Sequence, residues 1–210
     1  MLSIKQFSLG MLETNCYLLI NNNLGLAIDP GGDPAVVLKF LRDRNLRLDI
    51  ILNTHLHFDH IQGNAALAAG TGAEIHAPAE DEFLLSTEVG GGGFMGFPTT
   101  PAFDFKPLSA GETRFLDSFC HILSTPGHTP GSLSFYFPEI EAVFVGDLIF
   151  FRSVGRTDFP GGDAEILKKS AREKIFSLPD KTVIYSGHGP ETTVGDEKLY
   201  NPFFHDIKSI

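Results

Sequence analysis

Tryptophan is absent from this chain of 210 residues, and cysteine and basic residues are scarce. Two cysteines, Cys16 and Cys120, are too few for a disulfide framework. Both stand in apolar runs, so we expect buried free thiols. The 16 basic residues against 26 acidic ones give a net charge of −10, which disfavours nucleic acid as a partner. This charge leaves a small anionic substrate possible, because a few local cations are enough to bind one.

Long apolar runs are also missing, and none reaches the roughly 18 residues that a membrane span requires. The first residues, Met-Leu-Ser-Ile, lack the basic and then apolar pattern of a secretion signal. We therefore expect a cytoplasmic protein that does not contact membranes. The length suits one domain over residues 1–210. The sequence does not indicate an oligomeric state.

Four side chains of metal-binding type stand close together in the string His55-x-His57-x-Asp59-His60. The run before it, residues 48–53, is apolar and predicts a buried strand. Alternate residues of an extended chain face the same way, so His55 and His57 should converge just beyond the strand. Helix-forming residues follow over 61–69, which places Asp59 and His60 on a first helical turn. Their side chains should then point at a second position nearby.

This arrangement predicts two metal ions rather than one. Imidazole and carboxylate groups accept zinc, iron or manganese. The alternative is a polar cluster that caps a helix, which three histidines and an aspartate fit poorly.

Three further candidates lie where an apolar strand gives way to a Gly- or Pro-rich turn: His128, Asp147 and His188. Binding groups gather on such strand-end loops, and flanking glycines allow the backbone to turn sharply there. Each alone is a modest signal, because a single loop histidine is usually a surface residue. With the first string they make seven candidate ligands, enough for two ions. The other histidines, His76, His121 and His205, lack this context and are assigned to structure.

The remaining pattern predicts two strand-rich halves with covering helices, an α/β fold of four layers. Predicted strands cover residues 2–9, 15–20, 24–29, 113–124, 132–137, 141–147 and 181–186. A helix should begin at Asp163, which has a favourable capping side chain. Residues 86–107 are too rich in Gly and Pro for a regular element. Their interleaved Phe and Met leave two interpretations open, a flap near the site and an inert surface loop.

The first string, followed in order by His128, Asp147 and His188, resembles the metallo-β-lactamase superfamily over essentially the whole chain. The resemblance implies an αββα sandwich with the metal site at the edge of the two sheets. It implies two divalent metal ions, with zinc expected and iron or manganese possible. In this family pattern Asp59, which could also orient the attacking hydroxide, is the catalytic candidate. The implied metal ligands are His55, His57 and His128 for the first ion, Asp59, His60 and His188 for the second, and Asp147 as the bridge.

The best-known lactamases carry cysteine where Asp147 stands, so the resemblance favours the hydroxyacylglutathione hydrolase (glyoxalase II) branch. The segment from Gly155 to Asp163 is similar to small bacterial members of that branch, and Arg156 is its candidate for binding glutathione. A structural salt bridge to Asp158 or Asp163 is the other interpretation of Arg156. Larger members carry a C-terminal helical extension for glutathione that is missing or minimal here.

The function that these residues imply is hydrolysis of a small-molecule thioester, such as S-lactoylglutathione, by a metal-bridging hydroxide. A mononuclear iron persulfide dioxygenase is the alternative, because members of that group share a similar Gly-Arg-Thr-Asp string. In that case only His55, His128 and Asp147 would bind the metal.

Overall fold

The computed structural model describes residues 2–205 of the chain. It separates into two compact units, of which the first holds residues 2–109 and 114–118 and the second holds 110–113 and 119–205. The prediction of one domain over 1–210 stays a prediction, and residues 1 and 206–210 lie outside the described part. Within residues 2–205, no helix combines the length and the apolar character that a membrane crossing needs.

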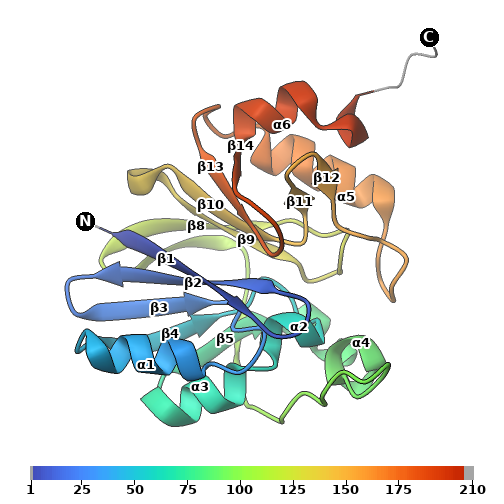
Figure 1. The fold of residues 1–210 in the computed structure, drawn as a ribbon. Helices are drawn as coiled ribbons and strands as arrows, with labels where there is room; N and C mark the ends of the chain where they lie inside the picture. The colour runs from blue at the N-terminus through green and yellow to red at the C-terminus, as the bar shows by residue number, and fades with distance from the viewer. Residues whose placement is uncertain (1, 206–210) are drawn as a thin grey trace. The chain divides into compact units, whose positions relative to one another are not determined.

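The first unit is built on a six-stranded sheet in the order β1-β2-β3-β4-β5-β6 (Figure 1). The first three strands pair antiparallel, and the pairs from β3 to β6 are parallel. Its elements are β1 (Ser3–Leu9), β2 (Thr14–Asn21), β3 (Leu24–Ile28), α1 (Ala35–Asp43), β4 (Arg47–Leu52), α2 (Phe58–Ile61), α3 (Asn64–Thr71), β5 (Glu74–Pro78), η1 (Ala79–Ser86), α4 (Glu88–Gly91) and β6 (Lys106–Leu108).

The core of this unit lies between one face of its sheet and the helices α1 and α3. Val37 and Leu41 of α1 and Leu67 of α3 are buried against sheet residues such as Leu18 and Ile51. The apolar positions of α1 recur three to four residues apart, so one stripe of the helix faces the sheet. Full burial of each such side chain contributes about 1.5–3 kcal/mol. This packing fixes the ends of the strands, which carry the site residues.

The second unit has a six-stranded sheet in the order β14-β13-β10-β9-β8-β7 and a small pair, β11-β12. Here β10 and β13 run parallel, and the connection between them passes through α5, as parallel neighbours require a crossover. The elements are β7 (Gly111–Phe115), β8 (Ser118–Ser124), β9 (Leu133–Phe137), η2 (Pro138–Ile140), β10 (Ala142–Gly146), β11 (Ile149–Phe150), β12 (Ser153–Val154), α5 (Ala164–Ser170), η3 (Ala171–Ile175), β13 (Val183–Ser186), β14 (Thr192–Thr193), α6 (Val194–Tyr200) and η4 (Pro202–Phe204).

The predicted helix start at Asp163 is confirmed. Its carboxylate accepts hydrogen bonds from the backbone N–H groups of Glu165 and Ile166, at 2.9 and 3.0 Å, and so caps α5. Leu167, Ala171 and Ile175 recur four residues apart and are buried against β10 and β13. The helix continues from α5 through one π-helical turn, η3, before the chain enters β13.

Three expectations from the sequence are wrong in part. The strand predicted over 113–124 is two strands, β7 and β8, because the chain turns at Leu116 and Asp117, which both have positive φ angles. The helix expected over 61–69 is two helices, because the chain breaks between α2 and α3 at Gln62 and Gly63. The Gly- and Pro-rich segment 86–107 does contain regular structure, since α4 begins after Thr87 and β6 begins at Lys106. Gly90 and Gly91 lie within α4, whereas Gly92, Gly93 and Gly96 lie in the turn that follows and have positive φ angles.

Candidate metal centre

Four of the predicted ligands lie together at the carboxyl end of β4. The ring centroids of His55 and His57 are 4.7 Å apart, so the expected convergence of alternate residues is confirmed. Asp59 and His60 stand on α2, whose first turn follows His57. An Asp59 carboxylate oxygen (Oδ2) lies 3.6 Å from Nε2 of His60. All three imidazoles are buried.

Asp29 supports this group, although the sequence pattern predicts only that it ends the strand 24–29. It follows β3, the strand beside β4, and its backbone N–H donates to Leu52 at the end of β4. Its carboxylate accepts hydrogen bonds from the N–H and the Oγ1 of Thr54, at 2.8 and 2.6 Å. It also lies 3.0 Å from Nδ1 of His60. The signal that could have revealed it is a carboxylate at the end of the strand next to the metal-binding string.

The neighbours of Asp29 decide whether its carboxylate binds a metal itself or orients a histidine that does. Its carboxylate has an atom within 4.8 Å of the nitrogens of His55 and His60, which is close enough for a shared ion. However, three donors already occupy its two oxygens. With Nδ1–H of His60 donating to Asp29, Nε2 keeps the lone pair that binds a metal. Asp29 is therefore placed to orient His60, whose Nε2 is left available for a metal.

Replacement of Asp29 by alanine is expected to lower metal affinity about 10–100-fold, as for other partners that orient a metal-binding histidine. The reason is that His60 loses the acceptor that fixes its ring and its tautomer. Competition with a fluorescent chelator measures the affinity. Asp33→Ala is the control, because it removes an exposed carboxylate from the same loop. An affinity equal to that of the unmodified protein in Asp29→Ala would contradict the orienting role.

The other three predicted ligands lie together in the second unit. Gly146 at the end of β10 pairs with Ser186 at the end of β13, and the two strands run parallel. Asp147 and His188 follow these ends directly, so the sheet delivers both side chains to the same edge. His128 stands in the loop between β8 and β9, which Thr125 closes by donating its N–H to Ser132.

Asp147 lies between the two imidazoles of this group. Its Oδ2 is 3.6 Å from Nε2 of His128, and its Oδ1 is 3.7 Å from Nε2 of His188. These distances exceed a hydrogen bond. They are near the separation of two donors that bind one tetrahedral ion at about 2.1 Å, which is about 3.4 Å. His128 also donates from Nδ1 to the backbone carbonyl of Arg156 at 2.7 Å, which leaves Nε2 for a metal. These donors fit a divalent metal.

The guanidinium of Arg156 is already paired with a carboxylate of the protein, so it is not a free cation. Its guanidinium forms two hydrogen bonds of 2.7 Å to the carboxylate of Asp158 and lies over the ring of Phe159. These bonds hold the pKa of Asp158 at about 2, so the carboxylate is charged at neutral pH. Both side chains are more than half exposed. The salt bridge considered from the sequence is therefore present, with Asp158 as the partner.

The histidines assigned to structure lie apart from these groups. His76 is on β5 beside Glu74, at 3.6 Å, and His121 on β8 stacks on Tyr136. His205 is exposed at the end of the described chain. The two cysteines are buried free thiols, as expected.

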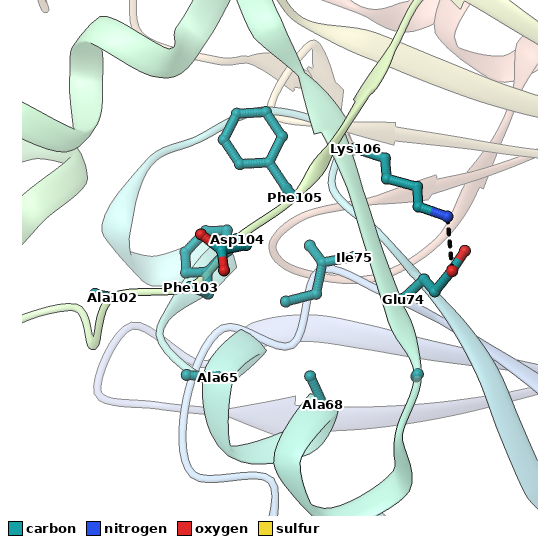
Figure 2. A pocket seen from close by; sticks show the side chains of 10 residues that line it. Ala65, Ala68, Glu74, Ile75, Ala102, Phe103, Asp104, Phe105 and Lys106 are labelled. Atoms are coloured by element: carbon teal, nitrogen blue, oxygen red, sulfur yellow. Dashed lines mark hydrogen bonds and ion pairs between the residues drawn. The ribbon is translucent and has the colours of Figure 1, made fainter.

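A hollow of about 400 Å³ in the first unit is a separate feature (Figure 2). Ala65 and Ala68 of α3, Ile75 of β5 and the rings of Phe103 and Phe105 form most of its lining. At its margin, Nζ of Lys106 lies 2.6 Å from a carboxylate oxygen of Glu74. Because this lining is mainly apolar, Glu74 is paired with Lys106, and Asp104 is the one further carboxylate of the lining, the hollow has no character of a metal site.

A family model described as the metallo-β-lactamase superfamily matches residues 9–188. This range contains all seven predicted ligands. The chain belongs to the metallo-β-lactamase superfamily.

Relatives of this superfamily member match over nearly their whole length. The hydroxyacylglutathione hydrolase GloC of Haemophilus influenzae is 37% identical over 209 residues, which are 97% of this chain and 99% of that protein. The crystal structure of BLEG-1 B3 metallo-beta-lactamase is 35% identical, with a TM-score of 0.91 over 97% of this chain and all of that one. The crystal structure of TTHA1623 in a di-iron-bound form is 36% identical, with a TM-score of 0.86 over 95% of this chain and 99% of that one.

These matches confirm the predicted fold class, an α/β fold of the metallo-β-lactamase type with two sheets and helices. They also class the chain as a metallo-hydrolase of this superfamily, a group that uses divalent metals. The His and Asp groups in each unit agree with this class. Which residues bind the metal, which metal it is and which substrate is cleaved are finer questions than this class, and our answers to them are proposals.

Proposed function

We propose that the chain hydrolyses a small-molecule thioester with two divalent metal ions. The seven ligands are the two groups described above: His55, His57, Asp59 and His60 from the first unit, and His128, Asp147 and His188 from the second. The position of Asp147 carries the proposal, because each of its oxygens lies 3.6–3.7 Å from a different imidazole nitrogen. A carboxylate with a different imidazole beside each of its two oxygens is suited to bridge two ions. The di-iron form of TTHA1623 supports a pair of ions.

When bound, such a pair of ions lowers the pKa of a water toward about 7 and polarises a carbonyl oxygen. The chain's residues position the reactants for that chemistry. Asp59 accepts a hydrogen bond from Thr14 Oγ1 at 3.3 Å, which restricts the rotation of its carboxylate. Held in this way, Asp59 orients the attacking water and accepts its hydrogen bond. We assign Asp59 as the catalytic residue on this basis.

The cysteines support attack by water rather than by a protein thiol. Burial raises the pKa of the Cys16 thiol far above its ordinary range and raises that of Cys120 to about 12. Neither forms the thiolate that nucleophilic catalysis needs at neutral pH. The absence of an activated cysteine supports water as the nucleophile, as in a hydrolysis.

Zinc is our proposal for the metal, since its preference for imidazole and carboxylate ligands matches the site. Iron and manganese accept the same ligands. For the substrate, a thioester such as S-lactoylglutathione is supported by the relative GloC, named as a hydroxyacylglutathione hydrolase. The net charge of −10 remains an argument against nucleic acid as the substrate. A cytoplasmic location stays a prediction.

We propose that Arg156 binds an anionic part of the substrate by exchanging Asp158 for it. Both partners of this ion pair are exposed, so solvent screens their attraction and a substrate carboxylate can compete. Arg156→Ala should raise KM several-fold for S-lactoylglutathione and leave kcat within about twofold, as expected when binding is lost equally in ground and transition states. Steady-state kinetics of the two proteins measure both constants. A KM unchanged by the substitution would leave Arg156 with a structural role only.

A mononuclear iron dioxygenase is less well supported. It would use His55, His128 and Asp147 and leave four candidates without a ligand role, namely His57, Asp59, His60 and His188. Lactam hydrolysis is a second candidate because of the similarity to BLEG-1, which is named as a lactamase.

One set of assays separates these activities. Protein loaded with zinc, manganese or iron is given S-lactoylglutathione, a chromogenic cephalosporin, or glutathione persulfide with an oxygen electrode. We expect metal-dependent cleavage of the thioester that a chelator abolishes. Oxygen uptake with the persulfide, or faster turnover of the cephalosporin than of the thioester, would contradict the proposal.

A further inference from the structure

Residues 92–99, which we call the aromatic hairpin, form an ordered turn after α4. Gly92 and Thr99 pair as an antiparallel bridge, and the N–H of Gly93 donates to Pro98 at 3.2 Å. Within the turn, the N–H of Phe97 donates to the carbonyl of Phe94 at 2.8 Å. Positive φ angles at Gly92, Gly93 and Gly96 allow this tight path. The sequence allowed two interpretations of this segment, an inert surface loop and a flap near the site. These hydrogen bonds give the turn a defined structure.

The aromatic hairpin is anchored on α2, the helix that carries Asp59 and His60. The ring of Phe58, next to Asp59 in the chain, lies 4.9 Å from that of Phe97 and 5.4 Å from that of Phe94. Such edge-to-face and tilted ring pairs add about 0.5–1.5 kcal/mol each beyond the burial of their area. The side chain of Gln62 also donates to the carbonyl of Pro98 at 2.7 Å. Movement of this hairpin is therefore linked to the helix of the metal centre.

The tip of the aromatic hairpin exposes Met95, whose side chain is 88% accessible to solvent. Its backbone has a φ of 49°, a conformation that methionine rarely adopts. This backbone conformation costs free energy, and it leaves the flexible apolar side chain of Met95 exposed to water. Residues 89–103 also contain no charged side chain, in a protein that is 20% charged. A neutral, apolar segment beside the helix of a metal centre is suited to an apolar part of a ligand.

From these observations, and on the basis of the proposed function, we infer that the aromatic hairpin determines acyl specificity. Met95 and the ring of Phe94 beside it contact the apolar acyl chain of the thioester, while Phe58 and Phe97 hold the hairpin in place. The substrate class that this selects is the thioester with an aliphatic or aromatic acyl group. S-lactoylglutathione, with its short polar acyl group, should therefore be cleaved but be a poorer substrate than a glutathione thioester with such an apolar acyl group.

The test uses binding, so it does not depend on turnover. S-methyl-, S-butyl- and S-hexylglutathione, which are stable thioethers, are titrated calorimetrically into the metal-loaded full chain. For the unmodified protein we expect Kd to fall as the alkyl chain lengthens. Met95→Ala should weaken binding of the hexyl compound about tenfold, the usual size for a few apolar atoms, and that of the methyl compound less than about twofold. Met95→Lys should weaken the hexyl compound at least as much.

Val36→Ala is the matched control, because Val36 is a half-exposed apolar residue on α1 in the same unit. It should leave all three affinities unchanged. Equal weakening of the methyl and hexyl compounds by Met95→Ala, no weakening, or no dependence on chain length would overturn the inference. So would a failure of all three compounds to bind. Length-dependent binding without cleavage of any thioester would instead contradict the proposed function and leave the specificity role standing.

Discussion

Asp147→Ala is expected to lose metal and activity together. With alanine at this position, His128 and His188 lose the carboxylate that lies between them. Removal of a bridging ligand takes away both the attraction of a negative charge and the geometry that sets the distance between the ions. We expect kcat/KM to fall about 1,000-fold or more, which corresponds to about 4 kcal/mol of transition-state stabilisation. Metal bound per chain should fall from two ions to one or none.

Asp180→Asn is the control for this variant, since it neutralises an exposed aspartate in the same unit that has no part in the proposed site. Elemental analysis after gel filtration gives metal per chain, and a melting curve shows whether each variant is folded. A folded Asp147→Ala protein that retains two ions would exclude the bridging role.

Gly155→Ala is expected to disturb the same centre through the backbone. A Cβ atom at this position would lie 1.8 Å from the carbonyl oxygen of Asp147 and 3.3 Å from Nδ1 of His128. A backbone oxygen cannot move away without moving its residue, so both ligands would shift. Such overpacking costs about 2–4 kcal/mol of unfolding free energy. Loss of bound metal should accompany the loss of stability.

Gly31 provides the corresponding position in the first unit, since a Cβ there would lie 1.7 Å from the carbonyl oxygen of Asp59. Gly70→Ala is the matched control. Its nearest neighbour is a terminal methyl group of Leu38 at 2.8 Å, which can rotate away, and alanine favours the helix α3. Chemical denaturation and metal analysis of the three variants test this expectation. If Gly155→Ala matched the Gly70→Ala control in both, the contact with Asp147 would have no importance for the site.

The candidate site residues that the sequence predicted share one property, which is that a local pattern in the sequence marks each of them. His55 and His57 converge because alternate residues of an extended chain face one way, and Asp59 with His60 follows on the next helical turn. His128, Asp147 and His188 were found because each ends an apolar strand at a glycine-rich turn. These patterns depend on neighbours in sequence, so the sequence was sufficient to select these residues as candidates, and their role as metal ligands stays a prediction.

Asp29 could not be found in this way, because its role depends on which strands are neighbours. Only the parallel pairing of β3 with β4 brings its carboxylate to Thr54 and His60. The same reason applies to the aromatic hairpin. Its Phe and Met residues were noticed in the sequence, but the contact of Phe94 and Phe97 with Phe58 joins positions far apart in the chain. The break between α2 and α3 was also missed, although Gly63 lies at it, because a single glycine within a helical pattern is often tolerated.

The number of metal ions that catalysis requires tests the two-ion centre most directly. Metal-free protein is titrated with zinc while metal binding and thioester hydrolysis are followed in the same samples. We expect two equivalents to bind per chain, with little hydrolysis after the first and full activity only when the second has bound. Full activity at one equivalent, with no further change at two, would contradict the two-ion centre.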